Sequence, residues 1–307
     1  MITAFRLGDA LRCMLVGAPG GPNHAASTES MVSCRPLRNT TFWRQSIARD
    51  PNRVTVGDWK GMDVSSLASA RVRSGVRAWE VDRLYLPDQE PEKALDLLEQ
   101  VVQCAGARGA ERVFLRVALD SPITDLARKT GFYPYFEETH LVAAQESLQV
   151  LAQHSDVIGE MGKFAPEEPT ASDFHGLFQL YCASTPQRVR EGIGLTIDQW
   201  HDSQEPFQTH GSETVLKIDG KVVGWWAQRP FRKTSEGRMQ WHPNHPELVS
   251  HLIQLSRQTQ NWLIPSYQEN IVDLLTRQGF HNAGHYIILI KTVAVPVRSR
   301  ELSYVEA

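Results

Sequence analysis

The fold of this chain is decided by a short stretch that occurs twice, as Asp125–Phe132 (DLARKTGF) and as Asp273–Phe280 (DLLTRQGF). The glycines of the two stretches are 148 positions apart (279 minus 131). Phe114 and Trp262, in the apolar runs before the stretches, have the same separation (262 minus 114). A repeat that keeps its internal spacing indicates duplication of one structural unit.

Each stretch has the pattern of a short helix between two buried strands. The apolar run before it predicts a strand, and the apolar spacing within it predicts an amphipathic helix. The glycine that follows favours a left-handed cap at the end of the helix. The strands expected after the caps are Thr139–Val142 and Tyr286–Ile290.

The same elements are predicted upstream of both stretches. A longer helix is expected at residues 92–104 and at 247–258, because apolar residues recur there at helical spacing. Turn residues predict a hairpin around residues 58–61 and another at Asp219-Gly220. Each copy therefore reads as hairpin, strand, helix, strand, helix, strand, which predicts two α/β domains in tandem, each built on a mixed sheet.

The length of the chain agrees with two domains. A chain of 307 residues exceeds what one hydrophobic core organises, so about two units of ~150 residues are expected. We place an N-terminal domain at residues 1–150, a linker at 151–163 and a C-terminal domain at 164–307. The two copies are expected to open at Phe5–Val16 and at Asp173–Tyr181.

The composition is that of an ordinary globular protein, with 41% hydrophobic residues, 22% charged residues and a net charge of -3. This balance gives no reason to expect a nucleic acid or an anionic membrane as partner. Cys13, Cys34, Cys104 and Cys182 are scattered and form no Cys-x-x-Cys pair, so we expect reduced thiols and no metal site. No segment has the layout of a signal peptide or a membrane span, and a cytoplasmic location is expected.

The element order and the repeated helix, Gly-Phe, strand signature resemble the GNAT superfamily of acyl-CoA-dependent N-acyltransferases. The resemblance covers roughly residues 5–143 and 164–295. It implies two tandem GNAT-like domains, each with a sheet that splits to admit acetyl-CoA or another acyl-CoA beside a strand and a helix. It also implies transfer of the acyl group to the amine of a small molecule or peptide. The strand expected at residues 77–87 looks like the central strand before the family's cofactor loop.

The cofactor loop departs from the family pattern Gln/Arg-x-x-Gly-x-Gly/Ala, whose small residues let backbone N–H groups reach a pyrophosphate. Gln89 and Ala94 match the pattern and are the candidate cofactor-binding residues. The first glycine, however, is replaced by Glu92 in one copy and by Glu247 in the other, each directly after a proline. We expect each glutamate to satisfy the start of its own helix, which would weaken binding of coenzyme A.

Proton-transfer groups also depart from the family. The resemblance implies a tyrosine four residues before the Gly of Gly-Phe, where this chain has alanine and leucine. Tyr133 is the candidate replacement in the first copy, with Tyr135 beside it, and Tyr267 is the candidate in the second. Packing is the alternative role for all three tyrosines.

Glu80 and Asp82 are the candidate general bases, because they alternate onto one face of the first copy's central strand. An ion pair with Arg71 or Arg73 is the competing interpretation of these carboxylates. We match the two positions to Gln240 and His242 in the second copy, which leaves that copy without a carboxylate base.

Two further patterns each allow two interpretations. His242, His245 and Glu247 lie close in sequence, with His251 one turn later, but a capped loop is favoured over zinc. Trp225-Trp226 fits either a ligand pocket or packing against a helix. The sequence therefore supports two functions, an acyl-CoA-dependent N-acyltransferase and a catalytically inactive pair of domains that binds a ligand or a partner. It leaves open whether the protein is an enzyme and whether it forms a homodimer.

Overall fold

The computed structural model of the chain describes residues 2–4, 21–33, 50–61, 63–87, 89–143, 166–205, 211–231, 234–255 and 259–294. Three expectations fall outside these residues: the opening of the first copy at Phe5–Val16, the linker at 151–163, and the state of Cys13 and Cys34. Cys104 and Cys182 are free thiols, as expected.

Twelve strands of the described residues form one mixed sheet, in the order β1-β2-β3-β4-β5-β12-β6-β11-β10-β9-β8-β7. The first copy contributes β1 (Ile2–Ala4), β2 (Arg53–Lys60), β3 (Asp63–Val72), β4 (Ala78–Tyr85), β5 (Arg112–Ala118) and β6 (Tyr133–Ala143). The second contributes β7 (Pro166–Glu167), β8 (Ser212–Ile218), β9 (Lys221–Phe231), β10 (Thr234–Trp241), β11 (Asn261–Pro265) and β12 (Phe280–Thr292). When β1 is matched to β7, β2 to β8, and so on to β6 and β12, the strand order read from one edge of the sheet is the same as that read from the other edge. The predicted duplication is therefore confirmed.

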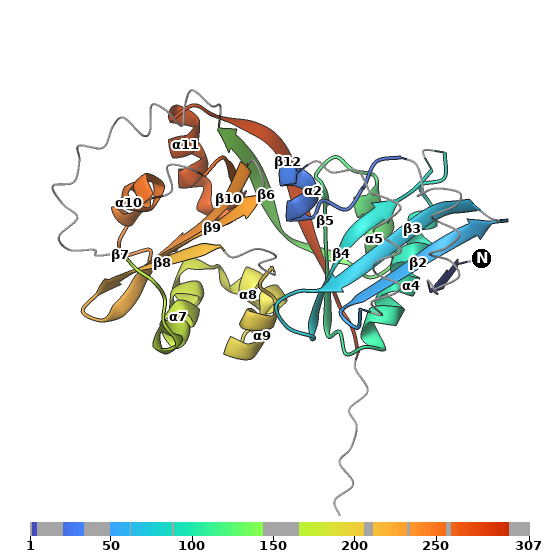
Figure 1. Cartoon of the computed structure of the whole chain (residues 1–307), viewed down its shortest axis with the longest axis horizontal. Helices are drawn as coiled ribbons and strands as arrows, with labels where there is room; N and C mark the ends of the chain where they lie inside the picture. The colour runs from blue at the N-terminus through green and yellow to red at the C-terminus, as the bar shows by residue number, and fades with distance from the viewer. Residues whose placement is uncertain are drawn as a thin grey trace, which may run out of the picture.

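The last strands of the two copies are interleaved at the centre of the sheet. β12 of the second copy pairs antiparallel with β5 of the first, from Tyr286↔Ala118 to Thr292↔Arg112. β6 of the first copy pairs antiparallel with β11 of the second, and β6 and β12 pair with each other. Figure 1 shows both strands running between the two copies. The sheet is therefore continuous, although the two copies follow one another along the chain.

The helices after the central strands end where the repeated glycines predict. α5 (Ile123–Lys129) and α11 (Glu269–Arg277) are followed by Gly131 and Gly279, and both glycines have a φ of 87°. This left-handed conformation is one that glycine adopts without steric cost. The longer helices are α4 (Lys93–Gly106) and α10 (Leu248–Leu255), as expected.

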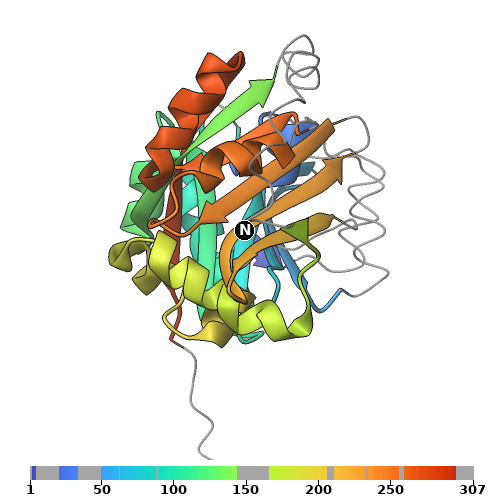
Figure 2. The same ribbon diagram turned by 90° about the vertical axis from the view of Figure 1, so that its left-hand side faces the viewer.

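Three further helices of the second copy cover the face of the sheet opposite to α10. They are α7 (Phe174–Ser184), α8 (Gln187–Ile193) and α9 (Ile197–Asp202). Trp226 packs in the core with α10, whereas Trp225 packs beside α7. Because successive strand residues point to opposite faces, α7 and α10 lie on opposite sides of β9, as Figure 2 also shows. None of the helices in the described residues is long and apolar enough to cross a membrane.

Candidate functional site

The parallel strands at the centre of each copy separate partway along their length. β4 and β5 are last paired at Val81↔Leu115, and β10 and β11 at Gly237↔Trp262. Each copy therefore has a split in its sheet beyond these pairs.

The two splits can be aligned through the last residue pairs before them. Val81↔Leu115 in the first copy corresponds to Gly237↔Trp262 in the second, and one residue earlier Glu80 and Glu236 lie opposite Arg71 and Arg229. The match of Glu80 and Asp82 to Gln240 and His242 was therefore wrong, because the counterpart of Glu80 by register is Glu236.

In the first copy the split is filled by an N-terminal segment of the chain. His24 donates its N–H to Leu84 O at 2.9 Å, and Ala26 donates its N–H to Arg116 O at 2.8 Å. The side-chain amide of Asn23 donates to Asp82 O at 3.0 Å and accepts the N–H of Leu84 at 2.8 Å. Residues 23–26 thus bridge β4 and β5 and take up the hydrogen-bonding groups that a ligand in this split would need.

In the second copy the split opens onto a cavity of about 380 Å³. Met239 and Gln240 of β10 and Leu263 and Pro265 of β11 line it. The side-chain amide of Gln268 crosses the split to Met239 O at 3.3 Å. In each split a side-chain amide thus donates to a backbone carbonyl, Asp82 O in the first copy and Met239 O in the second.

One wall of the cavity is aromatic. Phe174 and Tyr181 of α7 lie around Trp200 of α9, with ring centroids 5.6 and 5.8 Å from the tryptophan. Trp225 lines the same cavity and also packs beside α7, so the structure shows the packing interpretation of the tryptophan pair, with Trp225 at the cavity wall. Its indole N–H donates to a carboxylate oxygen of Glu213 at 3.2 Å.

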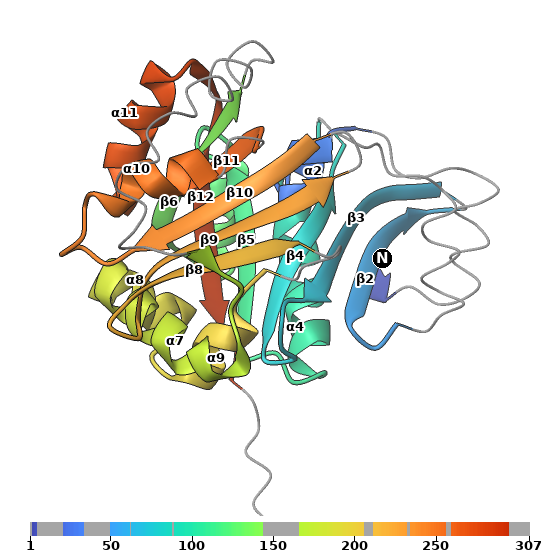
Figure 3. The ribbon, with the colours of Figure 1, turned by 60° about the vertical axis from the view of Figure 1, so that its left-hand side comes forward.

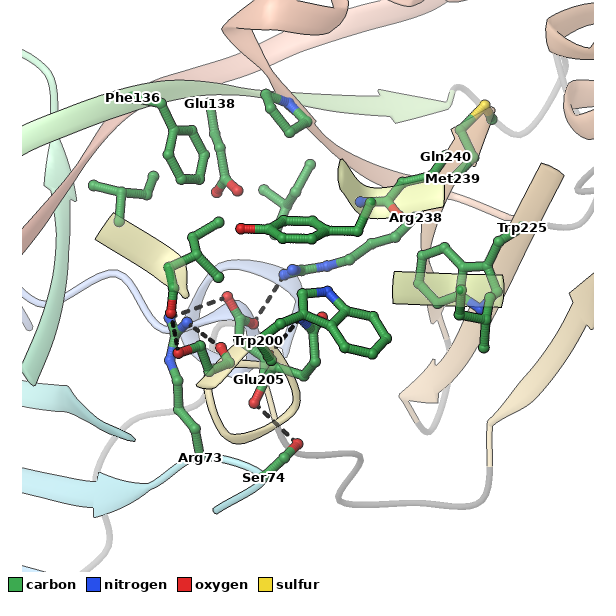
Figure 4. Close-up of a pocket in the computed structure, with 18 of the residues that line it drawn as sticks. Arg73, Ser74, Phe136, Glu138, Trp200, Glu205, Trp225, Arg238, Met239 and Gln240 are labelled. Carbon is green, nitrogen blue, oxygen red and sulfur yellow. Dashed lines mark hydrogen bonds and ion pairs between the residues drawn. The ribbon is translucent and has the colours of Figure 1, made fainter. Parts of the chain in front are cut away.

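The other wall is a buried ion cluster around Glu205 (Figure 4). The guanidinium of Arg116 donates to its carboxylate, and that of Arg238 donates at 2.9 Å. Arg73 and Arg229 lie 3.7 and 3.8 Å away. Burial raises the pKa of the Glu205 carboxyl, but the nearby arginines, led by Arg116, together hold it well below its usual range. Glu205 is therefore an ionised structural group and not a proton acceptor.

The charges of this cluster balance. Each of the four arginines around Glu205 has a second glutamate within ion-pair distance, and these partners are Glu80 for Arg73, Glu138 for Arg116 and Glu236 for Arg229 and Arg238. Four guanidiniums thus face four carboxylates, counting Glu205. Glu213 differs, because no ion pair joins it to another described residue, and its bond to Trp225 leaves part of the carboxylate for a ligand.

Comparison with known proteins identifies the architecture. Neither the protein-family models nor the curated protein sequences contain a match to this chain. A Drosophila protein matches in structure with a TM-score of 0.54 and 14% identity, covering 95% of this chain and 98% of that one. A tandem GNAT protein from the clavulanic acid biosynthesis pathway matches with a TM-score of 0.51 and 9% identity, over 95% and 98% of the two chains. The chain has a tandem GNAT fold. A GCN5-related N-acetyltransferase from Sphaerobacter thermophilus shares this GNAT architecture, with a TM-score of 0.51, 13% identity and 95% coverage of both chains.

The predicted bases of the GNAT reaction lie in ion pairs outside the cavity. Glu80 is buried, and its carboxylate lies 2.6 Å from Arg71 and 3.3 Å from Arg73. These are the ion pairs that the competing interpretation of the sequence gave it. Asp82 is buried 2.8 Å from Arg53. Burial raises the pKa of Asp82, but Arg53 and its neighbours lower it further, so it is ionised and paired. Both carboxylates are therefore paired with arginines in this structure.

The candidate tyrosines occupy three different environments. Tyr133 is 46% exposed at the start of β6 and does not line the cavity. Tyr135 and Tyr267 do line it, and burial raises the pKa of both phenols. Of the tyrosines singled out from the sequence, these two can hydrogen-bond a ligand in the cavity, as neutral groups.

The first three amides of α4, after the cofactor loop of the first copy, are bonded within the chain. The N–H groups of Lys93, Ala94 and Leu95 donate to the carbonyls three residues earlier. Ala94, in the first turn of α4, is fully buried, while Gln89 is exposed. Glu92 makes no side-chain hydrogen bond to the helix start. The expected capping by Glu92 is therefore wrong, because backbone carbonyls satisfy these amides.

The second loop is closed in a similar way. Leu248 and Val249 donate their N–H groups to His245 O and Pro246 O. The backbone N–H of Glu247 and the imidazole of His245 lower the pKa of the Glu247 carboxyl, so here the glutamate does bind its own helix start. Neither loop offers the row of amides that the pyrophosphate of acyl-CoA requires. No group of His, Cys, Asp and Glu in the described ranges is arranged to hold a metal ion.

Proposed function

We propose that the protein binds a small organic amine in the central cavity and uses the tandem GNAT fold as a binding scaffold. The observation that carries this proposal is Glu213, a carboxylate at the aromatic wall that is joined to Trp225 and to no described cation. A buried or half-buried carboxylate without a cation attracts a positively charged ligand.

The aromatic wall suits the same ligand. Phe174, Tyr181, Trp200 and Trp225 present rings to the cavity, and aromatic faces attract ammonium groups by about 0.5–2 kcal/mol each. A volume of about 380 Å³ lies at the lower end of ligand pockets, which limits the ligand to a small molecule or one side chain of a peptide. The arginine wall, with its charges balanced by glutamates, gives the ligand polar neighbours without repelling it.

Calorimetric titration with tyramine tests the proposal. We expect tyramine to bind at least tenfold more tightly than its uncharged alcohol analogue, 2-(4-hydroxyphenyl)ethanol. Glu213→Gln should remove this preference, and Glu99→Gln, which changes an exposed glutamate of α4, should leave it intact. Equal binding of amine and alcohol by the wild type, or no binding of either, would overturn the proposal.

Acyl transfer in the C-terminal copy is the second candidate. The specific observation in its favour is that the β10–β11 split opens onto the same cavity, with the Tyr267 phenol beside it. The loop geometry opposes it, because the pyrophosphate lacks its amides. Titration with acetyl-CoA decides between the two: a Kd below about 100 μM, or −5.5 kcal/mol, together with release of coenzyme A in the presence of tyramine, would favour the transferase.

A further inference from the structure

Residues 23–26 are held in the β4–β5 split as an added strand. Asn23 forms an antiparallel bridge with Tyr85, and the backbone bonds of His24 and Ala26 reach β4 and β5 respectively. Extended peptides bind exposed strand edges in this way, through main-chain hydrogen bonds. The β4–β5 split therefore has the geometry of a groove for an extended peptide. Residues 23–26 of the same chain occupy this groove.

The segment continues from this groove into the ion cluster of the cavity. Thr28, 4% exposed, begins α2 (Thr28–Ser33), which packs against β9 and β10 of the second copy (Figure 3). Its hydroxyl donates to Glu205 and lies 3.2 Å from Arg116 Nη1 and 3.3 Å from Arg238 Nη2. Arg116 also donates to Ala26 O at 3.2 Å. One hydroxyl thus joins the inserted strand to charged groups of both copies.

We propose that the β4–β5 split is a peptide-binding groove whose resident ligand is the chain's own residues 23–28, and that the cavity's ion cluster clamps this ligand through Thr28. Because the strand is tethered, its local concentration in the groove is high, and a competing peptide cannot displace it while the clamp is closed. Weakening the clamp at Thr28 releases the strand and opens the groove. The proposal does not depend on the identity of the cavity ligand.

Hydrogen exchange measured by mass spectrometry on the peptide spanning residues 21–33 tests the clamp. Thr28→Val keeps the shape of the side chain and removes its hydroxyl, and we expect the exchange of this peptide to quicken at least tenfold. Thr28→Ser keeps the hydroxyl and should behave as the wild type. Ser30→Ala is the matched control, because Ser30 bonds within the segment, to Ser27, and to no residue of the cavity. Unchanged exchange in Thr28→Val would refute the clamp.

A labelled synthetic peptide of residues 21–33 tests the groove. We expect it to bind the double variant Asn23→Ala/Thr28→Val, whose own strand is loosened at both anchors, and not the wild type, whose groove is filled. Asn23→Ala alone removes the side-chain bonds to β4 without touching the ion cluster, so it serves if the double variant does not fold. Quickened exchange without peptide binding in either variant would overturn the groove while retaining the clamp.

Discussion

The buried ion cluster makes Glu205→Gln a severe substitution. The Glu205 side chain is 6% exposed, with Arg116 and Arg238 bonded to it and two further arginines within 4 Å. Neutralising it leaves four guanidiniums against three carboxylates in a buried site. Removal of one partner from a buried pair costs about 3–5 kcal/mol. In this variant Arg116 still has its ion pair with Glu138, and Arg238 still has its ion pair with Glu236. We therefore expect the free energy of unfolding to fall by an amount near the lower limit, about 3 kcal/mol.

Urea unfolding followed by tryptophan fluorescence measures this loss. The matched control is Glu167→Gln, because Glu167 forms an ion pair of 3.0 Å with Lys217 but its side chain is 53% exposed. An exposed ion pair contributes about 0–1 kcal/mol, so the free energy of unfolding of this variant should stay close to that of the wild type. Glu205→Gln/Arg238→Gln restores the charge balance and should recover part of the loss. If Glu205→Gln lowers the free energy of unfolding by less than about 1 kcal/mol, the cluster does not act as a buried, charge-balanced group.

Four other substitutions have defined outcomes. The hydrogen bond from Lys217 lowers the pKa of Asp173 to about 2. The ionised carboxylate therefore stabilises the fold above about pH 4, and this stabilisation is lost as the pH falls toward 2. In urea unfolding, Asp173→Asn should lower the free energy of unfolding at pH 7, and the difference from the wild type should vanish near pH 2. Gly131→Ala and Gly279→Ala should each cost about 1 kcal/mol in the same assay, because both glycines have a positive φ. Glu92→Gly should not create calorimetric binding of coenzyme A, because the neighbouring amides stay bonded to backbone carbonyls and the split is filled; micromolar binding would contradict this.

Local signals predicted the elements of the fold. Gly131 and Gly279 mark two helix ends in the same register, and the turn residues Asp219 and Gly220 both adopt positive φ, as a tight hairpin requires. These features depend on a few adjacent residues, so one sequence suffices to find them.

Strand pairing between the copies could not be found in this way. Ile287 and Leu289 pack in the core of the first copy, although they belong to the last strand of the second. A continuous apolar run such as residues 286–290 fits any buried position in a sheet, and nothing local selects the neighbour.

The ion cluster around Glu205 was missed for two different reasons. Arg116 stands between apolar residues in a buried strand, and a charge at such a position is a signal for a buried ion pair that was available in the sequence. Glu205 gives no such signal, because it lies after α9 in a segment without periodicity. The ion pairing of Glu80 with Arg71 and Arg73 was the competing interpretation of the sequence, and the structure has it.

The interleaved last strands have a consequence for the ancestry of the chain. Two separate copies of one ancestral subunit, each lending its last strand to the other, would form a closed dimer with this strand order, because a two-fold interface is self-complementary. Joining the two subunits end to end preserves every strand pair. After such a fusion neither copy has to close its own sheet, so one can take up a new occupant in its split while the other keeps an open cavity. A protease cut between the copies should accordingly leave two fragments that stay associated until they are denatured.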